Sequence, residues 1–212
     1  MSKVITVGNS KGGVGKSTIS TNLACMFAKK GKTLLIDADI QNSSMIFWNA
    51  RKTDDFTCIS NCTPKIHENV KNFTEFKYII IDAGGRDNPP FRSAIAASDH
   101  LIIPMTPSPA DLWSTEDVFK MYQEARINFK IKAHLLLNMC QQGISLNLEI
   151  QEMLNEHAKQ YDFSIMKSHL YFRVAYKESY AFGQSVVECQ GEKFKKASEE
   201  MTSLFNEIYK LK

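Results

Sequence analysis

The chain has 212 residues, and its 26 Lys and Arg against 23 Asp and Glu give a formal net charge of +3. With 43% hydrophobic and 10% aromatic residues it can form an ordinary core, which excludes an intrinsically disordered chain. No apolar run approaches the ~18–20 residues that span a bilayer, and the first residues are typical of a strand rather than of a signal peptide. We therefore expect one soluble, cytoplasmic domain covering residues 1–212.

The charge is spread unevenly along the chain. Residues 1–53 contain eight Lys or Arg and two Asp or Glu, residues 167–212 contain eight and six, and the middle of the chain is acidic. This asymmetry indicates anionic partners at particular surfaces. The five cysteines are scattered and lack the spacing of a zinc site, so we interpret them as reduced and mostly buried thiols.

Short apolar runs alternate with helical patterns along the chain. The runs are typical of strands buried on both faces, and they predict strands at residues 4–7, 33–36, 78–81, 100–103 and 133–137, with a weaker edge strand at 56–60. Helical patterns cover residues 16–30, 43–51, 109–127, 146–160 and a closing segment within 191–212, whose apolar stripe indicates a core face rather than a membrane anchor. The alternation predicts an α/β domain with a mostly parallel, twisted sheet and helices on both faces.

A glycine-rich segment lies between the first predicted strand and the first predicted helix, as a phosphate-binding loop requires. It reads Gly12-Gly13-Val14-Gly15-Lys16-Ser17-Thr18. Its backbone N–H groups would form an anion nest at the helix N-terminus, Lys16 would reach the β and γ phosphates, and Ser17 would ligate Mg²⁺. Ser10 stands where the usual pattern has its first glycine, so the strict motif is not met.

Three carboxylates follow predicted strands. Asp37 and Asp39 come after the second strand, where α/β folds place their chemistry, and Asp82 ends an apolar run as in a Walker B strand. We expect Asp82 to face Mg²⁺ through water. Arg86, a few residues later, is interpreted either as a contact to phosphate or a dimer partner or as a surface ion pair with Asp87.

Lys11 gives the loop a second lysine, and K-G-G-V-G-K-S-T resembles the deviant Walker A ATPases of the ParA/MinD family. The resemblance implies a P-loop NTPase fold, ATP and Mg²⁺ as cofactors, and a homodimer that encloses ATP. In it Lys11 contacts the phosphates bound to the other subunit. It also implies that Asp39 positions or activates the attacking water and that Asp37 holds a water of the Mg²⁺ shell. Ile40 departs from the family's D-x-D-P-Q pattern.

Further segments extend the resemblance from residue 3 to about residue 190. It implies that Asn138, with Met139, reads the adenine, although a strand-ending Asn is also a common turn residue. Residues 103–111 resemble the proline-rich motif of small plasmid ParA proteins, which places Pro107 beside the nucleotide; a rigid strand–helix connection is the alternative. Residues 172–188 resemble the ParA C-terminal stretch. We expect no N-terminal winged helix, which matches the short plasmid type.

The resemblance implies a partition ATPase that binds DNA without sequence preference, associates with the nucleoid as an ATP dimer, and is stimulated by a ParB-like centromere-binding partner to segregate plasmid or chromosomal DNA. The candidate DNA contacts are Arg173, Lys177, Lys193, Lys195 and Lys196. A MinD-like, membrane-cycling ATPase is an alternative, but the last turn carries only Lys210 and Lys212, so no membrane partner is expected. A small-molecule P-loop kinase or ligase would leave Lys11 unexplained, and an iron–sulphur reductase needs paired cysteines.

Overall fold

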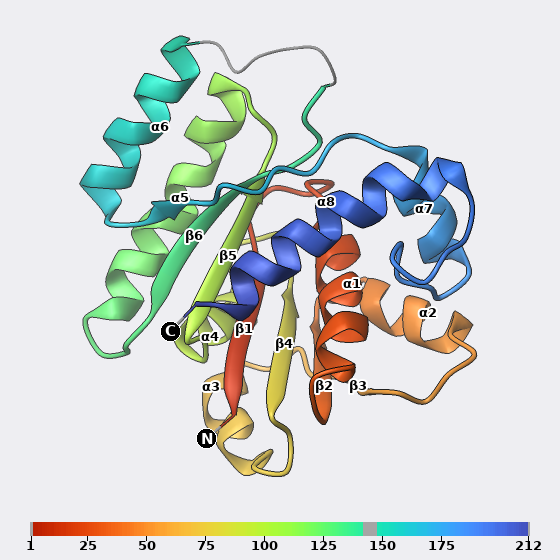
Figure 1. The fold of residues 1–212 in the computed structure, drawn as a ribbon. Coiled ribbons are helices and arrows are strands. Elements are labelled where there is room, and N and C mark those ends of the chain that lie inside the picture. Colours follow the sequence, from red (N-terminus) through yellow and green to blue (C-terminus); the bar gives the residue numbers. More distant parts are fainter. Residues whose placement is uncertain (1, 142–147, 212) are drawn as a thin grey trace.

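A seven-stranded sheet forms the centre of the computed structural model, which describes residues 2–141 and 148–211. The strand order is β3-β2-β4-β1-β5-β6-β7, and all neighbouring strands are parallel (Figure 1). The strands are β1 (Lys3–Gly8), β2 (Thr33–Ala38), β3 (Thr57–Ser60), β4 (Tyr78–Ala83), β5 (His100–Met105), β6 (Lys132–Leu137) and β7 (Ser164–Ile165). The predicted parallel α/β sheet is confirmed.

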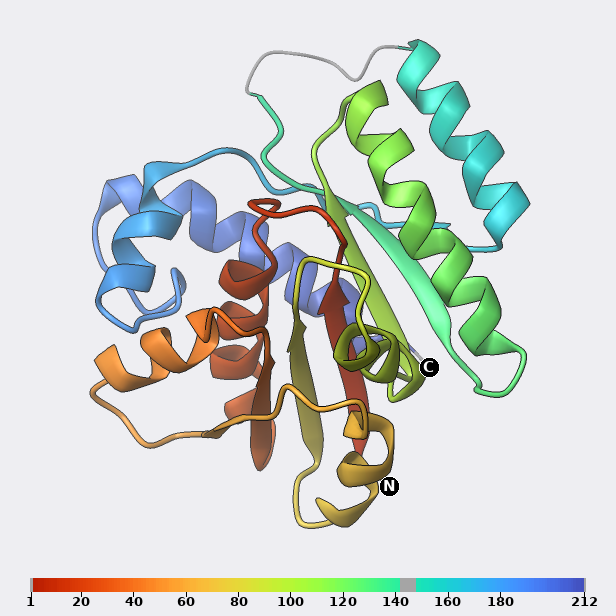
Figure 2. The same cartoon turned by 180° about the vertical axis from the view of Figure 1, so that it is seen from behind.

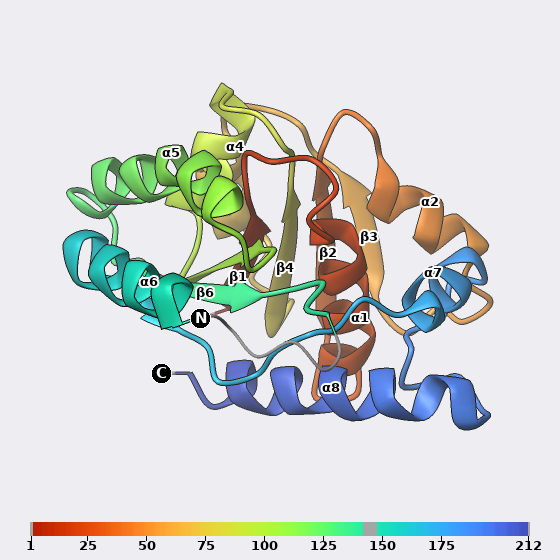
Figure 3. The same ribbon diagram turned by 90° about the horizontal axis from the view of Figure 1, so that it is seen from above.

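Helices cover both faces of this sheet (Figure 3). On one face lie α1 (Lys16–Ala28), α2 (Ser43–Ala50), α7 (Val174–Ala181) and α8 (Glu192–Tyr209). On the other lie α3 (Ile66–Asn69), the short 3-10 helix η1 (Val70–Asn72), α4 (Pro89–Ala96), α5 (Pro109–Arg126) and α6 (Leu148–Tyr161), with α5 and α6 side by side (Figure 2). Alternate strand residues supply the two cores: Ile5 and Val7 face the first set of helices, and Val4 faces the second.

The predicted strands are all present, and most of them extend beyond their apolar runs. β2 continues through Asp37 to Ala38, and β4 continues through Asp82 to Ala83. A parallel ladder needs paired backbone groups rather than apolar side chains, so both acids lie inside the sheet. The edge strand β3 is confirmed, one residue shorter than predicted.

Several short elements are absent from the predicted set: α3, η1, α4, α7 and β7. α4 begins with Pro89 and Pro90, which fit the first turn of a helix because those N–H groups have no intrahelical acceptor. Its N-cap Asn88 accepts a hydrogen bond from the Phe91 N–H at 2.8 Å. Helix 146–160 is confirmed from Leu148, and its first two predicted residues lie outside the described part.

The closing helix α8 packs into the core, as its stripe predicts. Met201, Leu204, Phe205 and Ile208 are all buried, and the Phe205 ring lies 4.9 Å from that of Phe27 on α1. The apolar face of α8 is therefore occupied by the sheet and α1. Within residues 2–141 and 148–211, no helix combines the length and the apolar character needed to cross a membrane.

Candidate active site

A cavity of about 880 Å³ opens at the edge of the sheet where β1, β2 and β4 end. β1 lies between β4 and β5, so the chain order reverses there, which is where open α/β sheets hold their ligands. The predicted loop and carboxylate segments meet around this cavity. Its lining includes Gly12, Gly13, Gly15, Lys16, Ser17, Thr18, Asp39, Gln41, Gly84, Gly85, Arg86 and Met139.

The loop has the backbone shape of an anion nest. Gly13 and Gly15 have φ values of 78° and 88°, in the left-handed region that favours glycine. Gly15 is the N-cap of α1, and no side chain caps that helix end. The first N–H groups of α1 therefore lack intrahelical acceptors beside the cavity and can donate to an anion.

Lys16 folds back over the loop. Its side chain is buried, and its Nζ donates to the Lys11 carbonyl at 2.8 Å. Burial lowers its pKa, while the nearby carboxylates of Asp82 and Asp39 oppose that shift. The ammonium also lies close to Gly85, where a Cβ would be 3.1 Å from Nζ. This arrangement places one positive charge inside the cradle.

Lys11 points away from the same cradle. Its ammonium forms an ion pair with Asp111 in the first turn of α5, and its side chain is 41% exposed whereas that of Asp111 is 6% exposed. Asn9 fixes the backbone here: its Oδ1 accepts from the Lys11 N–H at 3.0 Å, and its Nδ2 donates to the Pro104 carbonyl at 2.8 Å. The two loop lysines therefore have different surroundings.

Asp37 and Asp82 lie directly opposite each other on β2 and β4. Both are almost fully buried. Asp37 accepts from the backbone N–H groups of Asp39 at 3.1 Å and Met45 at 2.9 Å, so it fastens the N-terminal turn of α2 to the sheet. Burial raises the pKa of Asp37. In this structure its carboxylate oxygens are occupied by backbone donors, whereas a role in the Mg²⁺ shell stays a prediction.

Hydroxyl groups surround Asp82. Ser44 donates to it at 2.7 Å and Ser20 at 3.3 Å. Burial raises the pKa of Asp82 to about 6, although Ser17, Ser44 and Lys16 oppose the shift. A cation near this carboxylate would offset the cost of burying its charge.

The donor set beside the loop fits Mg²⁺. The Ser17 hydroxyl and the Asp82 carboxylate are hard oxygen donors, and Mg²⁺ usually takes one or two protein oxygens together with phosphate oxygens and water. Within the described ranges, no group of three or more His, Cys, Asp or Glu side chains could hold a metal by itself. Phosphate oxygens and water would complete the coordination.

Asp39 and Arg86 lie at the cavity wall. Asp39 accepts from the Gln41 N–H at 3.0 Å, and its carboxylate packs against Gly84. Arg86 is exposed and lines the cavity, while Asp87 pairs with Arg92 at 2.7 Å. The ion pair between Arg86 and Asp87, one of the two interpretations of the sequence, is not formed.

The residues predicted to bind the base lie beside the loop. Asn138 is buried, and its Nδ2 donates to the Val14 carbonyl at 2.7 Å, so the amide already holds the phosphate loop. Met139 has a left-handed backbone with φ of 55° and lines both this cavity and a neighbouring one of about 840 Å³. Pro107 lines only the neighbouring cavity.

Two contributions to the site come from residues that sequence reasoning missed. The first is the pair Ser20 and Ser44, whose hydroxyl groups donate to Asp82. The second is α7, which brings Lys177 and Tyr180 to the cavity wall. The Tyr180 hydroxyl donates there to the Ser43 carbonyl at 2.5 Å. Lys177 is predicted from the sequence as a DNA contact. Because α7 lies more than a hundred residues from the loop, no local pattern marks these contacts.

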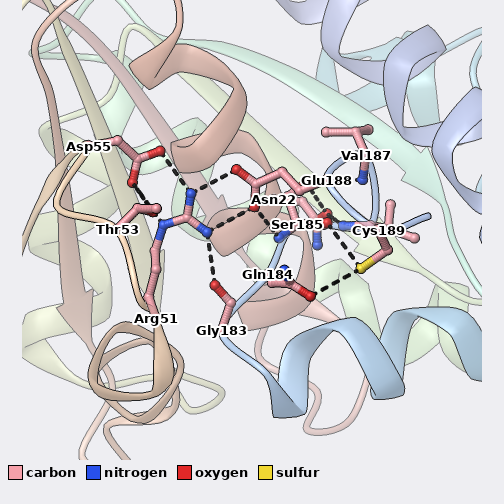
Figure 4. A network of polar contacts seen from close by, with 11 residues as sticks. Asn22, Arg51, Thr53, Asp55, Gly183, Gln184, Ser185, Val187, Glu188 and Cys189 are labelled. Atoms are coloured by element: carbon pink, nitrogen blue, oxygen red, sulfur yellow. Dashed lines mark hydrogen bonds and ion pairs between the residues drawn. The ribbon is translucent and has the colours of Figure 1, made fainter.

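A partly buried polar network fixes the segment after α7 (Figure 4). The Arg51 guanidinium bonds Asp55, Glu188 and the Gly183 carbonyl, all at 2.7–2.8 Å. Asn22 on α1 accepts from the Ser185 hydroxyl at 2.7 Å. The network joins α1, the end of α2 and the segment after α7, and thereby positions the α7 residues at the cavity.

The other predicted DNA contacts have varied surroundings. Arg173 pairs with Glu200 and Lys193 with Glu178, at 2.5 Å and 2.6 Å. Lys195 and Lys196 are exposed on α8, and neither takes part in an ion pair within the described residues. The structure therefore leaves Lys195 and Lys196 as the more accessible members of this set.

Comparison with known proteins places the chain in a family. The model of the CobQ/CobB/MinD/ParA nucleotide binding domain matches residues 5–186. The maintenance of carboxysome distribution protein A of Halothiobacillus neapolitanus is 26% identical over 96% of this chain and 95% of its own length. A protein ParA from Rhizobium radiobacter is 28% identical over 85% of this chain and 83% of its own.

A solved ATP complex of McdA from Cyanothece has the same fold, with a TM-score of 0.79 over 100% of this chain and 98% of that one, at 15% identity. The family match covers the loop, the three carboxylates and Asn138. The chain therefore belongs to the CobQ/CobB/MinD/ParA family, and it is a ParA/MinD-type ATPase.

Proposed function

We propose that this chain is a ParA-type partition ATPase that dimerises around ATP and segregates plasmid or chromosomal DNA. The observation that carries the proposal is the contrast between the two loop lysines. Lys16 is buried in the cradle, whereas Lys11 is directed outward and held by Asp111. A loop that binds only the nucleotide of its own subunit does not require the second lysine. A dimer in which each loop also contacts the phosphates bound to the other subunit does require it.

In the proposed reaction the loop N–H groups and Lys16 bind the phosphates, and Lys11 of the second subunit adds positive charge where negative charge develops. Asp39 lies at the cavity wall, where it would orient the attacking water. Lys11 must leave Asp111 before it can act in the other subunit. The ion pair would therefore oppose dimerisation until ATP is bound.

Mg²⁺ would be held by Ser17, with Asp37 and Asp82 acting through water. When bound, the ion supplies charge stabilisation for the β and γ phosphates. Burial raises the pKa of Asp82 to about 6, which still leaves its carboxylate mostly ionised at neutral pH, and a nearby cation would offset the cost of that buried charge. Asn138 and Met139 would contact the adenine, with Pro107 at the far side of Met139.

We propose that the ATP dimer binds DNA without sequence preference and so associates with the nucleoid, and that a ParB-like centromere-binding partner triggers hydrolysis and release. Lys195 and Lys196 support the DNA step because they are exposed and carry no carboxylate partner in the part of the chain that is described. Lys177, which lines the nucleotide cavity, would link the two functions.

The dimer is tested by mixing two variants, Lys11→Ala and Asp39→Asn, each expected to be inactive alone. In a mixed dimer the Lys11→Ala subunit keeps its own Asp39 and receives Lys11 from its partner, so one of two sites is intact. An equimolar mixture should recover about a quarter of the wild-type ATPase rate. If the mixture stays inactive while both variants bind ATP, Lys11 does not act across the dimer.

A second candidate function keeps the ATPase cycle and changes the cargo. A relative covering 96% of the chain is a protein for maintenance of carboxysome distribution, which favours a large protein assembly as an alternative cargo. The two are separated by deleting the gene and observing what is mislocalised. Loss of plasmids or chromosomes supports partition, whereas clustering of a protein assembly with normal DNA inheritance supports the second candidate.

A further inference from the structure

Four lysines gather at the edge of the sheet where the strands begin, opposite the nucleotide cavity. Lys3 starts β1, Lys77 directly precedes β4, and Lys30 and Lys32 lie just before β2. We call these four residues the lysine edge. The Lys3 N–H donates to the Lys77 carbonyl at 3.0 Å and the Lys77 N–H to the Lys32 carbonyl at 2.8 Å. Lys32, Lys77 and Lys3 therefore follow one another on neighbouring strands, about 4.8 Å apart.

The loop between α1 and β2 brings these positive charges closer together. A Cβ on Gly31 would lie 2.8 Å from the Lys77 Cδ, and Lys77 Nζ donates to the Lys30 carbonyl at 3.3 Å. Gly31 has a φ of 155°, at the limit of the region that favours glycine. The Lys77 side chain thus lies across the Lys30–Lys32 loop. Lys30, Lys32 and Lys77 therefore lie on the same part of the protein surface.

No carboxylate among the described residues forms an ion pair with Lys30, Lys32 or Lys77, although all three are exposed. The ammonium groups lie over aromatic rings instead: Lys32 is 4.8 Å from the Phe76 ring centre, Lys77 is 5.2 Å from that of Tyr78, and Lys30 is 5.9 Å from that of Tyr209. These rings hold the positive charges in place without cancelling them.

The acids nearby leave the positive charge in excess. Asp99, which directly precedes β5, accepts from the Val4 N–H at 2.8 Å. Glu75 is exposed in the loop before Lys77. Lys3 is partly buried and its ammonium donates to the Leu211 carbonyl, which anchors it at the end of α8. Like charges this close repel one another, and a polyanion bound here would relieve that repulsion.

We propose that the lysine edge binds the phosphate backbone of duplex DNA. The proposal adds a contact surface to the DNA-binding part of the proposed function. It rests on that function for one point, namely that the polyanion is a nucleic acid. A lipid surface is disfavoured because membrane-binding basic surfaces also carry apolar side chains that insert. Among the exposed large apolar residues of the described part, only Tyr209 touches the lysine edge, and Lys30 lies over its ring.

The position of this surface has a consequence for nucleotide control. Strands of six residues separate it from the nucleotide cavity by about 20 Å, and every residue of it belongs to one chain. A single lysine edge can therefore bind DNA weakly without ATP. In a dimer joined through the nucleotide cavities the two lysine edges lie at opposite ends, so ATP would raise affinity only for DNA long enough to reach both.

The test is the affinity of the full chain for a short mixed-sequence DNA duplex, without nucleotide, with ADP and with ATP. The variant Lys30→Gln/Lys32→Gln/Lys77→Gln keeps the side-chain stems and removes three charges. We expect affinity to fall at least about tenfold in every nucleotide state, and the slope of log affinity against log salt to flatten by about 3. ATPase activity without DNA should stay at the wild-type level.

A matched control, Lys52→Gln/Lys65→Gln/Lys159→Gln, removes three exposed charges elsewhere and should change affinity less than about twofold. Equal effects of the two triple variants, or loss only in Lys195→Gln/Lys196→Gln, would overturn the lysine edge while leaving the proposed function intact. Wild-type protein that binds no DNA in any nucleotide state contradicts the DNA part of the proposed function itself. Wild-type binding to phosphatidylglycerol vesicles but not to DNA, lost in the first triple variant, would reassign the surface to lipid.

Discussion

The two edges of the parallel sheet differ in whether their charged side chains are buried or exposed. Where the strands end, Lys16, Asp37 and Asp82 are buried. Lys16 donates a hydrogen bond to the Lys11 carbonyl, and the two carboxylates accept hydrogen bonds from fixed partners. Where the strands begin, Lys30, Lys32 and Lys77 are exposed and have aromatic rings as neighbours. Burial with fixed partners suits a site that must stabilise charge during a reaction, because nothing has to reorganise. Exposure suits long-range attraction of a polyanion.

Buried titratable groups lie near both edges, and burial shifts the pKa of the acid and of the histidines in opposite directions. Burial raises the pKa of Asp82 to about 6 at the nucleotide edge. Near the opposite edge, His100 Nδ1 lies 3.0 Å from His134 Nε2, and burial lowers the pKa of both imidazoles to about 4. In each case the low-dielectric interior favours the neutral form. The acid lies where a metal cation can compensate, whereas the histidines lie near Lys3 and Lys132, which lower the pKa of both further.

The largest expected effect separates catalysis from binding at the nucleotide edge. Asp39→Asn should lower the ATPase rate by about 100-fold, because the neutral amide cannot orient or activate water as a carboxylate does. Nucleotide affinity should change little. The measurement is single-turnover hydrolysis together with fluorescent-nucleotide binding. Asp54→Asn, an exposed control, should match the wild type, and an active Asp39→Asn protein would remove Asp39 from the mechanism.

The histidine pair should give the opposite edge a pH dependence of stability. Its folded pKa values of about 4 lie below the ordinary 6.5, so the unfolded chain binds protons first as the pH falls. The pair's stability contribution is complete above pH 6.5 and is lost toward pH 4. Urea titrations of the wild type and of His134→Gln measure the two free energies of unfolding. The wild type's advantage over His134→Gln should fall by about 2–3 kcal/mol as the pH falls across this window.

Asp82 provides a check of opposite sign. Its folded pKa of about 6 exceeds the ordinary value of 3.8, so the folded state without cation or nucleotide binds the proton first. Asp82 therefore adds stability as the pH falls below 6, and Asp82→Asn should remove that gain.

If His134→Gln leaves the pH profile unchanged, protonation of the histidine pair does not control stability.

A smaller effect concerns the ion pair that holds Lys11. Asp111→Asn should free Lys11 while keeping the first turn of α5, so that ATP-dependent dimers form at roughly two- to fivefold lower protein concentration. This corresponds to about 0.5–1 kcal/mol, the range for a partly exposed pair. Sedimentation with a slowly hydrolysed ATP analogue measures it. Glu116→Gln on the same helix is the control, and weaker dimers in Asp111→Asn would contradict the restraining role.

The smallest effect concerns the geometry of the lysine edge. Gly31→Ala and Gly191→Ala both place a Cβ at positive φ, but only the first also meets Lys77, at 2.8 Å. Gly31→Ala should therefore lower the free energy of unfolding by about 0.5 kcal/mol more than Gly191→Ala, and it should weaken DNA binding slightly. Urea unfolding and DNA titration measure the two effects. Equal losses in stability would show that Lys77 moves aside freely.

Local patterns in the sequence were enough to predict the main strands, the long helices and the phosphate loop. Apolar runs identify strands that are buried on both faces, and Gly13 and Gly15 mark a loop that needs positive φ. Of the three eight-residue helices, α2 was predicted but α4 and α7 were not, because helices this short depend on tertiary packing for their stability. Lys177 on α7 was accordingly assigned to DNA rather than to the cavity wall.

The amino-acid sequence specifies the chemical groups of this protein: a loop with two lysines, three carboxylates at strand ends, and an alternation that dictates a parallel sheet. The surroundings of each charge come from the tertiary fold. It buries Asp37 against the N-terminus of α2, directs Lys11 to Asp111, and gathers Lys30, Lys32 and Lys77 at the far edge. The physical reason is that burial and partners, which set the energy of a charge, depend on residues distant in the chain that only the sheet brings together.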